Sequence, residues 1–480
     1  MINSVIRLKS KKLKKSLIIK IIIYIVIIYN NIMERVAPNQ LNYDDQLPIA
    51  IESKSQRREF YPEGGSTYGP NGGAHPNVVR IPINADSMLD VQNSYLRFDL
   101  KNANANSHTL SVDFPQSMIK RVRISSGGVI LEDINSYNRL YCGILYPTQA
   151  TLGMLKEGSI SAGQSNTSAG TGAGSSVADI AVDNVDCPVH NIGAQLSAGN
   201  TISMAFHLAS GLLNMDKYLP LVMMNAGFII ELEFDVVGSL GCCSAGFTNT
   251  DWEVSNIRYM AHLVDLQRDF YDRLRMVMEG SGGVLQLAGQ TYRHFSGQFV
   301  SGGTKASINI PARVKSIKSI FFKNTIEADV AGHTKFGISD GITKGITEYQ
   351  FRIGSVVYPP TAVAVSATNK GEAYQELRKS FGTLGSLEHG GVLLNSNTYL
   401  VNATVGSTVA SVPHLAPYGL DFEAFNRTAL ESGVNSADRS LPISLELTSA
   451  GAAIVSTVDA YVLCDAIFYV NLDGTCSVSV

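Results

Sequence analysis

One short segment of the chain has the letters of a catalytic motif. Gly337-Ile-Ser339-Asp-Gly341 fits the GxSxG pattern of a nucleophile elbow, in which a serine stands on a strained turn between a core strand and a helix. The flanking residues, 332–335 and 342–345, are instead polar and glycine-rich. We therefore predict a glycine-rich turn in a polar loop here, and we expect no catalytic residue and no enzymatic activity.

Metal and cofactor sites are not indicated either. The nine histidines do not pair at spacings that ligate a metal from one helix or turn, and no HExxH, paired CxxC, EF-hand or GxxxxGK[ST] segment occurs. The six cysteines form no spacing pattern typical of a disulfide framework, so we interpret them as buried or free thiols of a reducing compartment. No metal, cofactor or cofactor-binding residue is predicted; the cysteines are Cys142, Cys187, Cys242, Cys243, Cys464 and Cys476.

The charge distribution argues against nucleic acid as the main partner. The net charge is −3, but seven of the 38 Lys and Arg residues precede the first acid, Glu34. The rest of the chain has 31 Lys and Arg against 41 Asp and Glu, a net charge of −10. Binding to phosphates needs a clustered basic surface. We interpret Lys120, Arg121 and Arg123 as the solvated or interface face of a strand, and expect no sequence-specific contact with nucleic acid.

Residues 1–32 form a basic and apolar leader. The apolar run Leu17–Tyr29 has 13 residues and is interrupted by Lys20, whereas about 20 residues span a bilayer. Tyr29 to Asn31 lack the small side chains of a signal-peptide cleavage site. Three interpretations stay open: translation starting at Met33, a membrane-associating segment, or a signal.

The elements that carry these residues are expected to be strands. The chain has 45% apolar and 16% charged residues with 43 glycines, which favours sheets joined by turns. Its length of 480 residues predicts two domains of roughly 200 residues each. The fold class is therefore predicted to be all-β.

Four short segments recur in the same order about two hundred residues apart, which indicates a tandem duplication. In the third pair, strict alternation of apolar and polar residues places one strand face in a core and the other in water. The pairs are Ile119–Arg123 with Val314–Lys318 (195 apart), Gly143–Thr148 with Gly354–Thr361, Ile230–Val236 with Ile443–Thr448 (213 apart), and Trp252–Leu266 with Val458–Leu472.

The remaining segments define the predicted organisation. Helical spacing is expected after each Tyr-Pro and between Asp265 and Glu279, and the polar loop Gly158–Val177 is expected at the surface. Two tandem jelly-roll barrels with short helices in loops are predicted. The predicted boundaries are a leader at 1–32, an N-terminal arm without periodicity at 33–77, the first jelly roll at 78–264, a linker at 265–283 and the second jelly roll at 284–480.

The duplicated strands, together with Gly127–Tyr141, Leu212–Leu221 and Gly227–Val236, carry a resemblance. The sequence resembles the double jelly-roll major capsid proteins, above all those of polinton-like viruses and their virophage relatives. The resemblance covers roughly residue 78 to the C-terminus and rests on the order and pattern of the strands, and the leader departs from it.

This resemblance implies a homotrimer whose six barrels form a pseudo-hexagonal capsomer of an icosahedral shell around double-stranded DNA, located in the virion. Its implied partners are further copies of the chain and the penton and minor capsid proteins, and the arm at residues 33–76 is expected to contact a neighbour, a minor capsid protein or an internal membrane. The loop Gly158–Val177 is expected on the exterior, near the threefold axis. The alternatives are a carbohydrate-binding, lectin-like sandwich and a metal-dependent cupin. The first would need exposed aromatics where Trp252 is predicted in a core strand, and the second would need a His-x-His motif that the sequence lacks.

Overall fold

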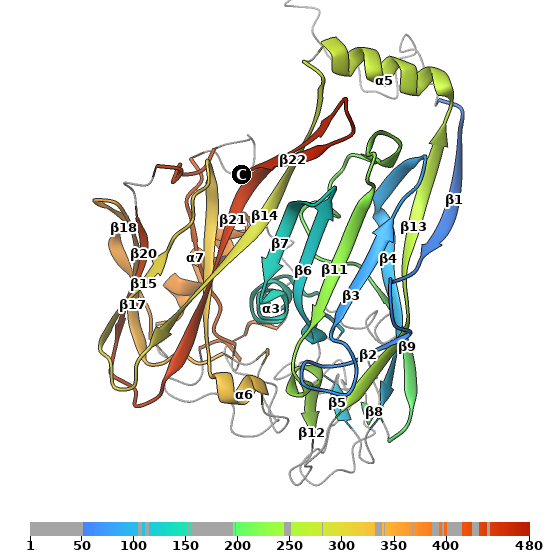
Figure 1. Ribbon diagram of the computed structural model, residues 1–480. Coiled ribbons are helices and arrows are strands. Elements are labelled where there is room, and N and C mark those ends of the chain that lie inside the picture. The colour runs from blue at the N-terminus through green and yellow to red at the C-terminus, as the bar shows by residue number, and fades with distance from the viewer. Residues whose placement is uncertain are drawn as a thin grey trace, which may run out of the picture. The chain divides into compact units, whose positions relative to one another are not determined.

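In the computed structural model, antiparallel strands account for most of the described chain (Figure 1). The structure describes residues 51–480 except 104–107, 111–114, 152–153, 155–194, 197, 244–250, 281, 332–337, 340, 367–368, 386–392, 396–397, 401–414, 425–431 and 439–441. The leader, residues 33–50 of the arm and the loop Gly158–Val177 lie outside the described residues. Residues 53–480 form one compact unit, and the following description concerns that unit.

The first half of the unit contains two principal sheets. The first has the order β1-β13-β4-β10, with β2 and β9 at its margins, and the second has the order β3-β11-β6-β7. A small sheet of β12, β5 and β8 adjoins them. The bounds are β1 (Ser53–Phe60), β2 (Thr67–Tyr68), β3 (Val78–Ile83), β4 (Met88–Asn102), β5 (His108–Leu110), β6 (Ile119–Ser126), β7 (Val129–Asn135), β8 (Gln195–Leu196), β9 (Thr201–Phe206), β10 (Leu219–Pro220), β11 (Phe228–Phe234), β12 (Gly241–Cys243) and β13 (Trp252–Leu266).

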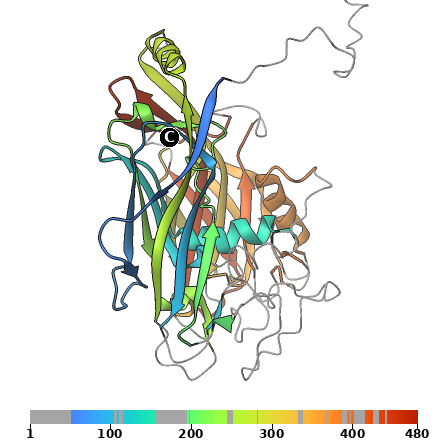
Figure 2. The same ribbon diagram turned by 90° about the vertical axis from the view of Figure 1, so that its right-hand side faces the viewer.

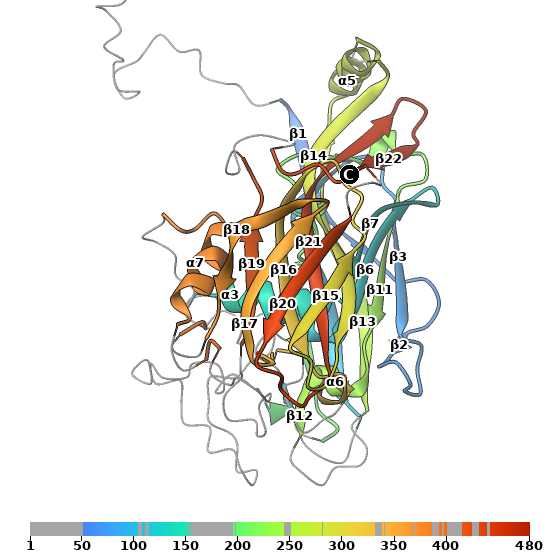
Figure 3. The ribbon, with the colours of Figure 1, turned by 90° about the vertical axis from the view of Figure 1, so that its left-hand side faces the viewer.

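The second half repeats this arrangement. One sheet has the order β14-β21-β16-β19, with β22 beside β21, and the other has the order β15-β20-β17-β18, which faces the viewer in Figure 3. The bounds are β14 (Val284–Phe299), β15 (Lys305–Ile310), β16 (Ile317–Thr325), β17 (Ile346–Ile353), β18 (Val356–Ala364), β19 (Tyr418–Asp421), β20 (Ile443–Ser449), β21 (Ser456–Asn471) and β22 (Cys476–Ser479).

The two halves have the same topology. If β1, β3, β4, β6, β7, β10, β11 and β13 are matched in chain order with β14 to β21, each principal sheet of the first half has the strand order of its counterpart. Two facing four-strand layers with this order are the jelly roll. The predicted fold class, all-β with two tandem jelly rolls, is therefore confirmed.

The match tests the four repeated segments. Ile230–Val236 and Ile443–Thr448 lie on the equivalent strands β11 and β20, and Trp252–Leu266 and Val458–Leu472 lie on β13 and β21, so these two pairs are confirmed. The strand β11 shows the predicted alternation of buried and half-buried residues.

The other two pairs are wrong. Ile119–Arg123 lies on β6, whose counterpart is β17, whereas Val314–Lys318 leads into β16, the counterpart of β4. Tyr146 begins a helix, whereas Tyr358 lies in the strand β18. Short apolar and Tyr-Pro segments are compatible with either environment, so these matches carry no information about equivalence.

The strand β1 lies within the segment predicted as an extended arm. Its residues, Ser53–Phe60, pair along their whole length with β13, from Ser53 opposite Leu266 to Phe60 opposite Tyr259. The sequence SKSQRREF has no apolar alternation because β1 is an edge strand whose first six residues are exposed. Backbone hydrogen bonds to β13, rather than side-chain burial, place it.

Short helices complete the unit. A continuous helical segment follows β7 (teal in Figure 2) and lies between the two jelly rolls (Figure 1), and α5 lies in the chain between β13 and β14, where a helix was predicted. The helix α7 was also predicted, whereas residues 152–158 are mostly outside the described part. The bounds are α2 (Tyr137–Leu140), the π-helix η3 (Tyr141–Leu145), α3 (Tyr146–Gln149), α5 (Arg268–Gly280), α6 (Glu327–Ala331), α7 (Gly371–Ser380), and the 3₁₀ turns η2 (Gln116–Met118), η5 (Leu221–Met223) and η6 (Val237–Leu240).

Candidate functional site at the junction between the jelly rolls

The metal and serine motifs considered in the sequence can be checked among the described residues. No group of three or more His, Cys, Asp or Glu residues among them is placed to hold a metal ion. Ser339 of the GxSxG segment lies in a turn, and its backbone carbonyl accepts a hydrogen bond from the Lys323 ammonium at 2.9 Å. This position matches the predicted turn.

The basic residues of β6 form ion pairs on the outer face of their sheet. Arg121 Nη2 lies 2.5 Å from Asp133 Oδ2, Arg123 Nη1 lies 3.3 Å from Glu231 Oε1, and the Lys120 ammonium lies 3.5 Å from Glu233. All three cations are half-exposed and paired with carboxylates on neighbouring strands. The three cations lie on a strand face, as predicted, and each forms an ion pair with a carboxylate.

A groove of about 390 Å³ lies on the face of the sheet β15-β20-β17-β18. Its lining is polar, with Lys305, Glu348, Gln350 and Glu446 among its residues. Tyr349, the aromatic residue in this lining, is fully buried, and its hydroxyl donates to the Gly419 carbonyl inside the barrel. Sugar rings bind on exposed aromatic faces, so this groove does not favour the lectin alternative. Trp252, as predicted, is a core residue, 1% exposed.

The most elaborate polar arrangement connects the two jelly rolls. Arg139, on α2 after the first jelly roll's β7, reaches the second jelly roll, where its Nη1 lies 2.9 Å from Asp459 Oδ2. Both guanidinium Nη atoms also donate to the carboxylate of Glu327 at 2.8 Å, and His294 Nε2 lies 2.8 Å from the other Asp459 oxygen. The Asp459 side chain is 1% exposed.

Electrostatics favour the charged forms of this pair. Burial alone would lower the pKa of Arg139, but the hydrogen bonds and charges of Glu327 and Asp459 outweigh it and raise that pKa. Burial alone would raise the pKa of Asp459, but the hydrogen bond with His294 and the charge of Arg139 hold it below its usual value. A buried pair with matched hydrogen bonds fixes orientation, because displacing either partner leaves a desolvated charge.

A second buried carboxylate also forms hydrogen bonds across this junction. Glu132 on β7 accepts hydrogen bonds from the backbone N–H of Gly211 at 2.9 Å and of Leu212 at 3.3 Å, and from the Ser210 hydroxyl. From the second jelly roll, the Thr291 hydroxyl on β14 donates to it at 3.0 Å. Burial raises the pKa of Glu132 above its usual value, and these hydrogen bonds offset part of that effect.

At two glycines, the backbone of the first jelly roll approaches the second jelly roll closely. A Cβ at Gly211 would stand 1.4 Å from the carbonyl oxygen of Gln290, and a Cβ at Gly143 would stand 2.6 Å from the Lys323 Cδ and Nζ. In addition, the Tyr461 hydroxyl donates to the Ser136 carbonyl at 2.9 Å. Side chains at either glycine would push the two jelly rolls apart.

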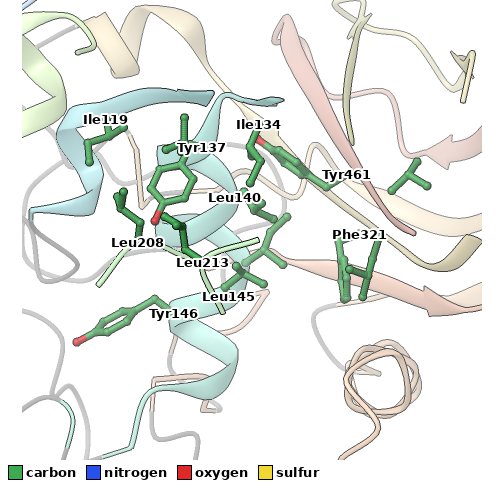
Figure 4. Close-up of a cluster of buried hydrophobic side chains, with 14 of the residues drawn as sticks. Ile119, Ile134, Tyr137, Leu140, Leu145, Tyr146, Leu208, Leu213, Phe321 and Tyr461 are labelled. Atoms are coloured by element: carbon green, nitrogen blue, oxygen red, sulfur yellow. The ribbon is translucent and has the colours of Figure 1, made fainter. Parts of the chain in front are cut away.

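Apolar packing continues across the junction. Figure 4 shows Leu140 and Leu145 of the helical segment with Phe321 and Tyr461 of the second jelly roll in one buried group. Most of the buried apolar residues of both halves belong to one cluster. The junction therefore has the character of a protein core, and not of a surface contact between independent domains.

Sequence reasoning missed this junction. Arg139 and Asp459 are 320 residues apart, and nothing in the segments that contain them pairs the two residues. One signal was available: Asp459 and Asp465 are acids inside the apolar run of β21, and carboxylates in such runs are seldom buried unless they are paired.

We expect protonation of the buried Glu132 carboxyl to make the free energy of unfolding depend on pH. A carboxyl whose folded pKa is raised contributes stability that is fully present below its unfolded pKa, about 4.3, and that is lost as pH rises through the folded pKa. Glu132→Gln cannot satisfy all the facing donors, so at pH 4 it should unfold about 1–3 kcal/mol more easily than the parent. The gap should narrow toward pH 8.

Urea midpoints of the full chain between pH 4 and pH 8 test this. Glu446→Gln, on the solvent face of β20, controls for the loss of one negative charge and should leave the midpoints almost unchanged. A gap between parent and Glu132→Gln that widened with pH would contradict the assignment.

Two jelly rolls of one topology, joined through a buried junction, define a double jelly-roll protein. No known protein family and no curated protein sequence matches the chain. Several solved structures are similar to the chain. PBCV-1 VP54, fitted into a cryo-EM reconstruction of the virophage Sputnik, has a TM-score of 0.57 at 9% identity, covering 91% of this chain and 99% of that chain. The Faustovirus major capsid protein has a TM-score of 0.54 at 10% identity, with 90% and 93% covered.

The mavirus major capsid protein is similar too, with a TM-score of 0.50 at 10% identity, covering 92% of this chain and 95% of that chain. These are major capsid proteins of double jelly-roll viruses. The expected resemblance is thus confirmed in the fold, over nearly the full length of both chains, at identities too low for sequence comparison alone.

Proposed function

We propose that this chain is a major capsid protein that assembles as a homotrimer into pseudo-hexagonal capsomers of an icosahedral shell enclosing double-stranded DNA. Its place is the virion, and its role is structural and not enzymatic. The sequence resemblance points to a polinton-like virus. Penton and minor capsid proteins are the further partners, with an internal membrane as an alternative contact of the arm.

The observation that carries the proposal is the rigid junction between two jelly rolls of one topology. A trimer of such chains presents six similar barrels, and closed threefold symmetry then approximates a hexagon. This works only if the two barrels within a chain keep a fixed relation, which the buried Arg139–Asp459 pair and the Glu132 hydrogen bonds support. The fold similarity to major capsid proteins adds to this argument.

The domain assignment belongs to the same proposal. We propose the first jelly roll at 78–264, the linker at 265–283 and the second at 284–480, with β1 added to the first because it pairs with β13. The helix α5 lies within the linker.

Solution mass and imaging of the full chain test the function. Light scattering after size exclusion should give three times the chain mass of 51.7 kDa. Negative-stain images should show particles with hexagonal outlines that tile at high concentration. A monomer at every concentration, without hexagonal particles or arrays, would overturn the proposal.

A further inference from the structure

A lysine and two carboxylates meet inside the second jelly roll, away from the junction. The Lys318 ammonium lies 3.0 Å from Glu423 Oε1 and 3.2 Å from Asp465 Oδ1. The three side chains are 6%, 4% and 4% exposed. Two acids and one base therefore meet at a site almost closed to water.

Neighbouring groups hold Asp465 in place. It lies on β21, next to β16, which carries Lys318, and its backbone N–H donates to the Ser316 carbonyl at 3.3 Å. The Ser316 hydroxyl donates to Asp465 Oδ2 at 2.8 Å, so one carboxylate oxygen is bound by a hydroxyl and the other faces the amine. Lys318 and the carboxyl carbon are thus positioned by two hydrogen-bonded strands.

Glu423 is fixed against the same pair. The backbone N–H of Phe422 donates to the Lys318 carbonyl at 2.8 Å, which ties the segment after β19 to the lysine's own backbone. The Glu423 carboxylate also accepts from the Ser432 hydroxyl at 3.1 Å. Its Oε1 therefore stands within proton-transfer distance of Lys318 Nζ.

We propose that Lys318 and Asp465 condense to an intramolecular isopeptide bond, with Glu423 transferring the protons. The Lys318 amine forms a bond to Asp465 Cγ, and the bond from Cγ to one carboxyl oxygen breaks. That oxygen leaves as water with two protons from the original ammonium, which Glu423 carries in turn. The product is a neutral amide, and the step needs no oxidant, reductant or further reactant.

The arrangement meets the physical requirements of this step. Amine and carboxyl are held within contact distance by the fold, and such intramolecular pairs react with effective molarities of about 10⁵–10⁸ M. The Ser316 hydroxyl can stabilise the developing oxyanion, and exclusion of water from the site disfavours the reverse hydrolysis.

The product would also resolve a costly arrangement. Buried ion groups are weak contributors to stability, since desolvation offsets their attraction. Condensation removes one positive and one negative charge and leaves an amide N–H beside Glu423. The bond would lock β16 to β21 in the central part of the barrel, whatever the function of the protein.

Intact mass and peptide mapping of the full chain test the proposal. The mass should be lower than the sequence mass by one water. Trypsin should leave Lys318 uncut and release residues 316–323 joined to residues 440–480, the fragment that contains Asp465. A full sequence mass with cleavage after Lys318 would overturn the proposal and leave a buried ion group. A link from 316–323 to residues 380–427 would overturn the choice of Asp465 in favour of Glu423.

Variants separate the chemistry from the fold. Lys318→Arg keeps the charge but cannot form the amide, so it should recover the full mass. Glu423→Gln should slow formation of the isopeptide bond by about 10²-fold or more. Its mass deficit should therefore appear only slowly when the folded protein is incubated without denaturant. Formation at the parent rate would exclude Glu423 as the proton carrier and overturn that role.

A matched exposed pair serves as the control. Lys101 Nζ lies 3.1 Å from Glu253 Oε2, a distance like those of the buried group, but the two side chains are 46% and 28% exposed. Lys101→Arg should leave the mass deficit unchanged. Should Lys318→Arg fail to fold, the tryptic map of the unsubstituted chain still decides between amide and ion group.

Discussion

Arg139→Met is expected to lower the free energy of unfolding by about 3–5 kcal/mol, because it leaves Asp459 buried without its main counter-ion. Methionine retains the length and apolar contacts of the arginine stem, so the lost guanidinium is the principal change. The Asp459 side chain is 1% exposed and cannot regain hydration without opening the junction. Equilibrium unfolding in urea measures the effect, with the single, buried Trp252 as the fluorescent probe.

The pH dependence of this effect has a definite sign. The pKa of Asp459 is lowered in the folded protein, so its contribution is present above the unfolded value of about 3.9 and is lost as pH falls through the folded pKa. A protonated Asp459 needs no counter-ion. The difference between parent and Arg139→Met should therefore be full at pH 7 and shrink as pH falls below about 4.

Two further variants test the cause. Arg121→Met removes an arginine of similar geometry that pairs with Asp133 on the outer sheet face, and it should cost less than about 1 kcal/mol because the pair is solvated. Arg139→Met combined with Asp459→Asn removes the unpaired charge and should regain more than half of the loss. If Arg139→Met unfolds within 1 kcal/mol of the parent, on the scale of a solvated pair, the pair does not fix the junction.

The sequence predicted those elements whose local pattern coincides with their environment. The alternation in β11 and β20 follows from one face on the core and one toward solvent, so period two alone identified both strands. The apolar runs of β13 and β21 were likewise visible, because most of their residues are buried. These two pairs were enough to reveal the duplication.

The Tyr-Pro pair shows why local letters fail elsewhere. Pro147 lies in the first turn of α3, where a missing backbone N–H is tolerated. Pro359 lies in the edge strand β18, which has no neighbouring strand on its outer side that would need that N–H. Both environments accept the same dipeptide. The choice between helix and strand comes from what surrounds the segment: the first copy fills the space between the jelly rolls, and the second closes a sheet.

The junction was beyond sequence reasoning for a similar reason. Its partners, such as Glu132 with Thr291, are placed by two separate ladders of strands that meet only in the folded chain. No local period encodes such a contact. The acids within β21 did indicate buried pairing, but they could not name Arg139 or Lys318 as partners.

Gly211→Ala is expected to produce the other large effect, since the added Cβ would stand 1.4 Å from the Gln290 carbonyl oxygen. That oxygen belongs to the backbone of β14 and cannot rotate away, so the two jelly rolls must shift relative to each other. The shift would also pull the Gly211 N–H from Glu132, which it meets at 2.9 Å. We expect a loss of at least about 3 kcal/mol in unfolding free energy, at the upper end of overpacking effects.

A graded series of alanine substitutions isolates the cause. Gly143→Ala meets the Lys323 side chain, which can move in part, so its effect should be smaller than that of Gly211→Ala. Gly371→Ala, at the start of α7, meets nothing within 4 Å and should be neutral or slightly stabilising. Urea midpoints and light scattering should rank the three in this order. Because a hexagonal trimer needs the two barrels in a fixed orientation, Gly211→Ala should reduce the fraction of trimer in favour of monomer. A urea midpoint and trimer fraction like those of the parent would show that the close contact at Gln290 does not fix the orientation of the barrels.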